Sequence, residues 1–276
     1  VANRWQHVAV TTATSENASN LDMGRTSDVD YLQGKMDDVR LYSRALSVAE
    51  IKLLYQSAQS QFNVSPVNRL TKGLVGYWTL DGKDTNWTSA TAGTTADKSG
   101  YGNTGTLTNM TQVISPTVGK IGQALNFSAS NDYITAGDIA ATDSQTQMTW
   151  AFWLYQTSYQ DNTFYISKAD PNNLTQSSWG LSNERSGWVG SVDDISAFIS
   201  PTLTSNPQSD AMCTSQDADI TLNQWMHVAV VYDGSQTGNT GRLKFYTNGI
   251  NRSFNGVTDC SGTIPASTTN STSAVI

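Results

Sequence analysis

Two segments of this chain, 220 positions apart, carry almost the same sequence. Residues 3–10 read Asn-Arg-Trp-Gln-His-Val-Ala-Val, and residues 223–230 read Asn-Gln-Trp-Met-His-Val-Ala-Val. The two segments contain the only two histidines of the chain, so we take the match as an internal repeat. One kind of folding unit is therefore started twice, at different points of the chain.

The rest of the sequence is typical of β-structure. Short apolar segments alternate with turns rich in Gly, Asn, Asp and Ser, which favours many short antiparallel strands. Ser47 and Glu50 form a capping box, which predicts one short helix after residue 47. The fold class that we expect is all-β, an antiparallel two-sheet jelly-roll sandwich with that single helix. The clearest predicted strands span residues 35–42, 124–127, 133–136, 149–155, 225–232 and 242–247.

Composition excludes several classes of partner. The 276 residues carry a net charge of −7 and no cluster of Lys and Arg, so we expect no binding to nucleic acid. The longest apolar run, residues 150–155, is far too short to span a membrane. The chain lacks an initiator Met, and we expect it to be a processed product or a fragment. Cys213 and Cys260, an even pair in an acidic chain rich in Ser, Thr and Asn, predict one disulfide in an oxidising compartment.

Several ordered motifs resemble the laminin-G-like, concanavalin-A-like jelly-roll domains of secreted bacterial proteins. In that family the closing strand and helix read like residues 34–47, Gly-Lys-Met-Asp-Asp-Val-Arg-Leu-Tyr-Ser-Arg-Ala-Leu-Ser. The resemblance covers nearly the whole chain and implies the same sandwich fold. The other motifs occur in the family's order at residues 73–81, 97–107, 119–127, 132–134, 148–153, 225–230 and 243–249.

The order of these motifs along the chain implies an unusual domain organisation. Residues 1–56 resemble the C-terminal part of one jelly roll, residues 57–72 form a linker, and residues 73–276 resemble a jelly roll without its own closing strand. Three alternatives follow. The chain is a piece of a tandem array cut out of register, or residues 21–56 close the fold of the same chain, or they close the fold of a neighbouring subunit. A stretch could also be missing near residues 11–18.

The sequence gives little support for catalysis. Related sandwich enzymes hydrolyse glycosides with two nearby glutamates, whereas Glu16, Glu50 and Glu184 are isolated here. The two histidines lie in equivalent places of the repeated strand, where a buried structural role is expected. We therefore predict that the chain is not an enzyme.

The resemblance implies a calcium site. The loop of residues 97–103 is rich in Asp, Asn and Gly, which supply the oxygen ligands that Ca²⁺ prefers. In the family this loop lies near the Asp of the opening strand and the acidic pair of the closing strand. The implied ligands are Asp81, Asp97 and Asn103, together with Asp37 or Asp38. The alternative is that Asp97 and Asn103 only form hydrogen bonds within a turn.

Aromatic residues in polar, loop-like surroundings are candidates for sugar binding: Trp87, Trp179, Trp188, Tyr101 and Tyr159. The long insert of residues 183–219 is a second place where binding could reside. We expect an extracellular or cell-surface, non-catalytic structural or adhesion module. Its partners would be copies of itself, neighbouring jelly-roll domains or surface glycans. The alternative is a carbohydrate-binding module of a larger secreted polysaccharide-degrading enzyme.

Overall fold

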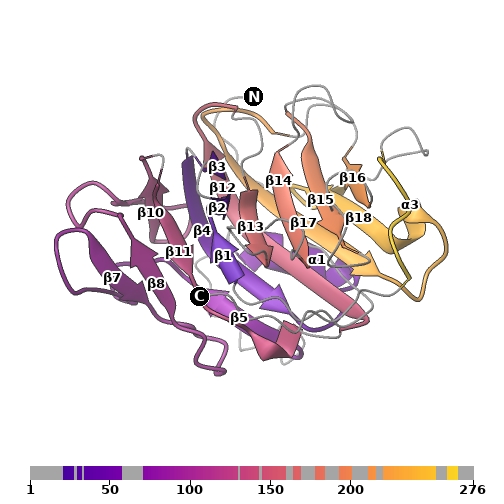
Figure 1. Cartoon of the computed structure of the whole chain (residues 1–276), viewed down its shortest axis with the longest axis horizontal. Coiled ribbons are helices and arrows are strands. Elements are labelled where there is room, and N and C mark those ends of the chain that lie inside the picture. Colours follow the sequence, from indigo (N-terminus) through magenta and orange to yellow (C-terminus); the bar gives the residue numbers. More distant parts are fainter. Residues whose placement is uncertain are drawn as a thin grey trace.

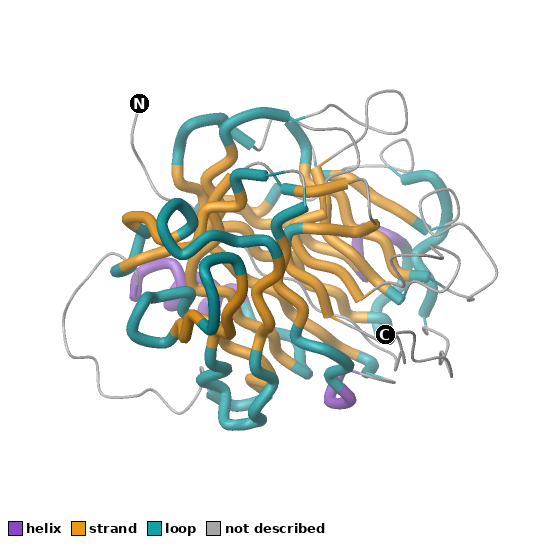
Figure 2. Tube along the Cα trace, turned by 60° about the vertical axis from the view of Figure 1, so that its left-hand side comes forward, coloured by secondary structure: helices purple, strands orange, loops and turns teal. Residues whose placement is uncertain are grey.

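The computed structural model of the chain consists of two antiparallel β-sheets that pack face to face (Figure 1). It describes residues 21–27, 30–32, 34–57, 71–129, 131–142, 145–159, 164–168, 178–183, 193–200, 211–215, 220–252 and 260–266. Strands form the two layers, and loops gather at their rims (Figure 2). The expected all-β sandwich is confirmed.

The first sheet has nine strands. Their spatial order is β16 (Met212–Thr214), β15 (Ile195–Ile199), β14 (Trp179–Asn183), β13 (Phe164–Lys168), β1 (Leu21–Met23), β11 (Tyr133–Thr135), β8 (Gly105–Thr108), β7 (Ala92–Thr95) and β6 (Thr85–Trp87). A separate small ribbon pairs β2 (Arg25–Ser27) with β3 (Asp30–Tyr31).

The second sheet has eight strands. Their order is β19 (Ile250–Asn251), β18 (Leu243–Thr247), β17 (Trp225–Asp233), β12 (Gln147–Gln156), β4 (Gly34–Tyr42), β10 (Gln123–Phe127) and β9 (Pro116–Val118), and β5 (Leu74–Trp78) pairs with β4 beside this path. The six strands expected from the sequence all occur in the two sheets, with ends that differ by a few residues.

The core lies between the two sheets. Alternate residues of β12 point inward, where Trp150 meets Trp179 of the opposite sheet with ring centroids 4.7 Å apart. Phe152 meets Tyr165 in the same way at 5.8 Å. Burying such large aromatic side chains is the main source of stability in a sandwich of this kind.

The N-terminal part of the described chain contributes to both sheets. Strand β1 lies between β11 and β13, and β4 lies between β10 and β12, so both occupy inner positions (Figure 1). In this single chain, residues 21–57 thus pair with strands of residues 71–266. Residues 1–20, which hold the first copy of the repeat, and residues 58–70 of the predicted linker 57–72 lie outside the described residues.

The expected helix is α1 (Val48–Ser57), and it begins with the predicted capping box. The Ser47 backbone N–H and hydroxyl donate to Glu50 at 2.8 Å each, and the Glu50 N–H donates to the Ser47 hydroxyl at 3.3 Å. The prediction from sequence did not include the second helix, α3 (Asn239–Arg242), or the 3₁₀ turn η1 (Ala140–Thr142), because neither is long enough to show a helical period. Within the described part, no helix is long and apolar enough to cross a membrane.

Candidate functional site

Two acidic residues of the predicted calcium site, Asp37 and Asp81, lie around the loop of residues 119–123, which connects β9 to β10 and ends at the first residue of β10. Asp37, in the middle of β4, is only 1% exposed. Its Oδ2 accepts the backbone N–H groups of Lys120 at 2.8 Å and Ile121 at 2.9 Å. The loop therefore covers Asp37 and binds its carboxyl group.

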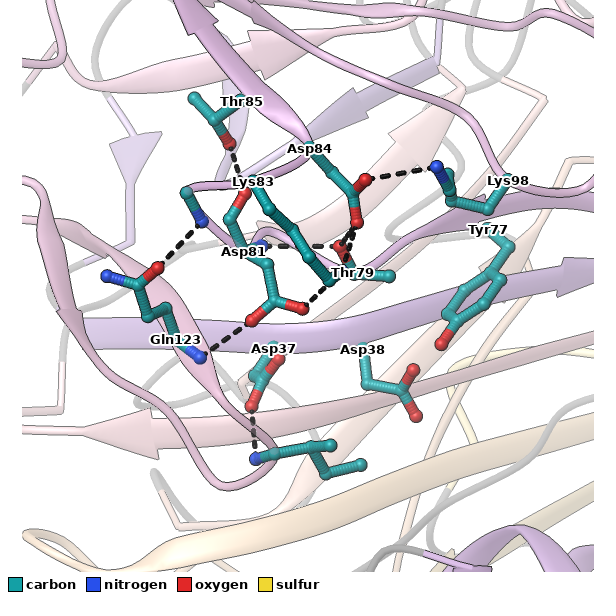
Figure 3. A network of polar contacts seen from close by, with 12 residues as sticks. Asp37, Asp38, Tyr77, Thr79, Asp81, Lys83, Asp84, Thr85, Lys98 and Gln123 are labelled. Carbon is teal, nitrogen blue, oxygen red and sulfur yellow. Dashed lines mark hydrogen bonds and ion pairs between the residues drawn. The ribbon is translucent and has the colours of Figure 1, made fainter. Parts of the chain in front are cut away.

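The same loop also binds Asp81, which follows β5. The N–H of Gln123 donates to Asp81 Oδ1 at 2.7 Å, and the Gln123 side chain accepts the N–H of Gly82 at 3.1 Å (Figure 3). Gly122 has a positive φ of 70°, and an added Cβ would lie 2.5 Å from Asp81 Oδ1. A glycine is therefore needed where the loop approaches this carboxylate.

Asp37 has an unusual electrostatic environment. Burial raises its pKa well above the usual value, and the charges of Asp38 and Asp81 raise it further, while the two loop N–H groups act in the opposite direction. Its second oxygen, Oδ1, has no hydrogen-bond partner among the described residues. A buried carboxyl oxygen without a partner is costly, so this atom could accept a proton or a cation.

Asp38 belongs to a β-bulge. The pairing of β4 with β12 shifts register here, and Asp38 has a positive φ of 53°. The bulge brings its carboxylate to Arg40, whose Nη2 lies 2.9 Å from Asp38 Oδ2. The guanidinium also lies over the ring of Tyr77, 4.6 Å from its centroid. Asp38 is thus committed to an ion pair on the face of the sheet.

Lys83 lies between the carboxylates of Asp81 and Asp84 (Figure 3). Its ammonium lies 2.8 Å from Asp81 Oδ2 and 2.5 Å from Asp84 Oδ2. Asp84 is also bound by Lys98 at 3.0 Å and by the hydroxyl of Thr79 at 2.7 Å. The bonds from Lys83 and Thr79 lower the pKa of Asp84, so this carboxylate stays ionised.

Asp97 and Asn103 form a separate hydrogen-bonded turn. Asp97 Oδ1 accepts the N–H groups of Tyr77 at 2.9 Å and Ser99 at 2.8 Å, and Oδ2 accepts the Ser99 hydroxyl at 2.7 Å and the Asn103 N–H at 2.9 Å. The Asn103 side chain donates to the carbonyl of Val75 at 2.8 Å. The turn is thereby attached to β5, and both oxygens of Asp97 have protein donors.

The structure thus brings Asp37 and Asp81 to one loop and gives Asp97 and Asn103 different partners. Among the described residues, no group of three or more His, Cys, Asp or Glu side chains could together hold a metal ion. The orphaned Asp37 oxygen fits a cation, whereas the saturated carboxylate of Asp97 does not. A calcium site with these ligands therefore remains a prediction.

The predicted sugar-binding aromatics have very different environments. Trp179 lies in strand β14 rather than in a loop, and it is 1% exposed, so its indole faces the core. Trp87 and Tyr159 are partly buried against the core. Tyr101 is 63% exposed on the tight 97–103 turn, and Trp188 lies outside the described residues. Of the four candidates that the structure describes, only Tyr101 offers an open ring.

The expected disulfide is present. Cys213 of β16 is bonded to Cys260, which lies 47 positions further along the chain. The bond ties the edge of the nine-stranded sheet to the C-terminal region. His227, which we expected to be structural, is 1% exposed and packs with its ring 4.9 Å from that of Trp153. The equivalent His7 lies outside the described residues.

Sequence reasoning missed several partly exposed polar and aromatic residues. Asp84 was overlooked because one of its partners, Lys98, comes from a different loop, that between β7 and β8. Lys35, Tyr155 and Trp225 lie side by side on the face of the eight-stranded sheet that points away from the core. Alternation within each strand places each residue on a face, but only the pairing register shows that the three are neighbours.

Residues 128–274, slightly more than half of the chain, match a laminin G family model described as the concanavalin A-like lectin/glucanases superfamily. The match begins after β10, so β1, β4 and β5 lie outside it even though they complete the same sandwich. No curated protein and no solved structure matches the chain.

Proposed function

The chain belongs to the concanavalin A-like lectin/glucanases superfamily and is a lectin-like or binding module, and we propose that it serves, without catalysis, in adhesion or structure outside the cell. Laminin G-like domains are typically extracellular, and the Cys213–Cys260 disulfide fits an oxidising compartment. Its partners would be surface glycans or other protein domains.

The environment of Asp37 is the observation that carries the non-catalytic assignment. Glycoside hydrolysis needs a carboxylic acid of raised pKa beside the sugar, and a second carboxylate about 5–10 Å away. Asp37 has the raised pKa, but the loop of residues 119–123 closes over it. Asp97 and Glu50 are bound by backbone and side-chain donors. Asp37 is therefore closed to a substrate, whereas Asp97 holds a turn and Glu50 the start of a helix.

The proposal is tested by measuring binding and hydrolysis with the same glycan panel. We expect the full chain to retain some glycans on an array and to release no reducing sugar from any of them, even after prolonged incubation. Hydrolysis that persists in a chain purified twice by unrelated methods would refute the non-catalytic role. Asp37→Asn is the matched variant, since it should leave binding unchanged.

We also propose that the module assembles with copies of itself through residues 21–57. These residues supply an inner strand to each sheet, and only residues 58–70 connect them to the rest. The same pairing surfaces would accept residues 21–57 of a second copy, which is the geometry of strand exchange.

Cysteine cross-linking distinguishes closure within a chain from closure between chains. Lys35 of β4 and Asn126 of β10 are direct partners on the outer face, so a cysteine at each position can bond across the two strands. We expect Lys35→Cys and Asn126→Cys chains, refolded together, to form covalent dimers. Lys244→Cys, whose site faces β17 instead, is the control for random pairing. Monomers alone, in both cross-linking and mass photometry, would refute assembly.

Calcium binding remains part of the proposal. The ligands would be Asp37 and Asp81 at the loop of residues 119–123. The other predicted ligands, Asp38, Asp97 and Asn103, would join only if their present bonds to Arg40, to the 97–103 turn and to Val75 were broken. The ion would couple residues 21–57 to the rest of the sandwich. We expect calcium to raise the melting temperature of the chelator-treated chain and Asp37→Asn to abolish the increase. Equal melting with and without calcium would refute it.

A further inference from the structure

The outer face of the eight-stranded sheet carries a continuous row of four partly exposed side chains. Asn126, Lys35, Tyr155 and Trp225 come from the neighbouring strands β10, β4, β12 and β17. Each is the direct cross-strand partner of the next. Directly paired residues point to the same side of a sheet, so the four side chains form one line. We call this line the outer-face row.

The two rings and the lysine of the row contact one another. The ring of Tyr155 lies edge-on to that of Trp225, with centroids 5.4 Å apart. On its other side, the Lys35 ammonium lies 5.1 Å from the centroid of the Tyr155 ring. Such cation–π contacts restrain a lysine without neutralising it. The row is therefore an ordered aromatic surface that ends in a positive charge.

The polar groups of the row are available to a ligand. Within the described part, the Lys35 ammonium has no carboxylate partner, and neither the Tyr155 hydroxyl nor the Asn126 carboxamide has a hydrogen-bond partner. These three polar groups lie beside Trp225 on a partly exposed surface. They match the donors and acceptors that a binding site needs.

The side chains in the next row of the same face are buried, so a ligand could reach the outer-face row but not its neighbour. Trp153, Asp37 and His227 are at most 1% exposed. Tyr55 of α1 covers Trp153 with ring centroids 6.2 Å apart, and the Lys120 ammonium lies 5.4 Å from the same ring. Asp37, the acidic residue of this buried row, is thus shielded, and the open part of the face keeps the positive charge of Lys35.

We propose that the outer-face row binds an acidic polysaccharide, with sugar rings stacked on Trp225 and Tyr155 and a sugar carboxylate paired with Lys35. Sugar C–H groups pack on aromatic rings, and sugar hydroxyls would bond to the Tyr155 hydroxyl and the Asn126 carboxamide. Four strands spaced by about 4.8 Å give a row of roughly 14 Å, which suits an oligosaccharide better than a single sugar.

The inference rests on the proposed role as a binding module and assigns it a ligand class and a surface. The probes are oligomers of galacturonate, mannuronate and guluronate, each compared with its carboxyl-reduced neutral counterpart. Calorimetry on the full chain at low salt should show tighter binding of at least one acidic oligomer. Added salt should weaken that binding, since the contact is partly ionic.

Lys35→Gln is the central variant, because it removes the charge and keeps a polar side chain of similar size. We expect roughly two- to fivefold weaker binding of the acidic oligomer, the range for one exposed ion pair, and unchanged binding of the neutral one. Lys244→Gln is the matched control, since Lys244 lies on the same face in β18 and away from the row. It should change neither affinity.

The aromatic part of the row is tested by Trp225→Ala and Tyr155→Phe. Trp225→Ala should abolish binding of both oligomers, and Tyr155→Phe, which removes only the hydroxyl, should weaken it while keeping the fold. Equal effects of Lys35→Gln and Lys244→Gln, or no binding of any uronate oligomer, would overturn the site. Binding that is lost instead in Tyr101→Ala or Trp87→Ala would also overturn it but would leave the binding-module role intact.

Discussion

Replacing Asp97 by asparagine tests whether hydrogen bonds alone hold the turn of residues 97–103. The carboxylate accepts four hydrogen bonds of 2.7–2.9 Å, three of them from backbone N–H groups of Tyr77, Ser99 and Asn103. An asparagine keeps one oxygen and turns an amide NH₂ toward the donors on the other side. With the NH₂ at the Oδ2 position, both bonds to that oxygen are lost: the Asn103 N–H then faces a donor, and the Ser99 hydroxyl must turn to accept from the amide.

The expected loss follows from these contacts. A hydrogen bond to a charged group contributes about 1.5 kcal/mol or more, so two lost bonds cost about 3 kcal/mol. Solvent reaches the turn and recovers part of this, which leaves about 2 kcal/mol. For a chain of this size, that loss lowers the melting temperature by about 4–8 °C.

Urea unfolding followed by tryptophan fluorescence measures the loss in free energy of unfolding. Repeating it with calcium and with a chelator shows whether Asp97 holds the turn or binds the metal. If the residue only holds the turn, Asp97→Asn loses the same free energy of unfolding with calcium and with a chelator. Ser99→Ala is the control, because it removes one hydroxyl donor and should cost about 0.5–1 kcal/mol. A loss below about 0.5 kcal/mol would refute the reasoning, and a loss seen only with calcium would make Asp97 a metal ligand.

Three further predictions concern other parts of the fold. The bonds from Arg44 and Ser47 overcome the effect of burial and lower the pKa of Glu50 to about 2 from its usual 4.5. Ionised Glu50 therefore stabilises the fold by about 1–2 kcal/mol above about pH 4.5, after allowance for solvent, and this contribution is lost as the pH falls toward 2. When the melting temperature is measured at decreasing pH, it should fall less steeply for Glu50→Gln than for the unchanged chain. Reduction of the Cys213–Cys260 bond, which closes a loop of 47 positions, should lower the free energy of unfolding by up to about 4 kcal/mol, as measured by urea titration with and without a phosphine reductant. In Gly180→Ala the new methyl group would lie 2.5–2.6 Å from two phenylalanine rings of the nine-stranded sheet. Urea titration should therefore show a free energy of unfolding lower by about 1–3 kcal/mol. An unchanged midpoint of the urea curve would mean that the rings move freely.

The fold class and most inner strands could be predicted because their sequences obey local rules. Strands β12 and β17 are short, nearly continuous apolar runs, turns rich in glycine separate the strands, and the Ser47–Glu50 capping box marks the start of α1. Each of these signals depends on residues close together in the chain. The disulfide was also predictable, because two cysteines allow only one pairing.

The sites could not be predicted in the same way, because they depend on the register between strands that are distant in sequence. Asp37 and Asp81 share the loop of residues 119–123 only because β4 pairs with both β10 and β5. Trp179 lies next to polar residues in the sequence but is buried, since the nine-stranded sheet places it against β12. Local polarity was a poor guide to exposure for that residue.

The bulge at Asp38 shows how one irregularity controls the whole outer face. Without the extra residue, β4 would keep one register along β12, and either Asp37 or Arg40 would point into the core. The register shift lets both lie outside, Asp37 beneath the loop of residues 119–123 and Arg40 against Tyr77. Lys35, two residues before Asp37, then also faces outward, opposite Tyr155. The candidate cation site and the outer-face row are therefore consequences of the same pairing, and deletion of Asp38 should disrupt both together.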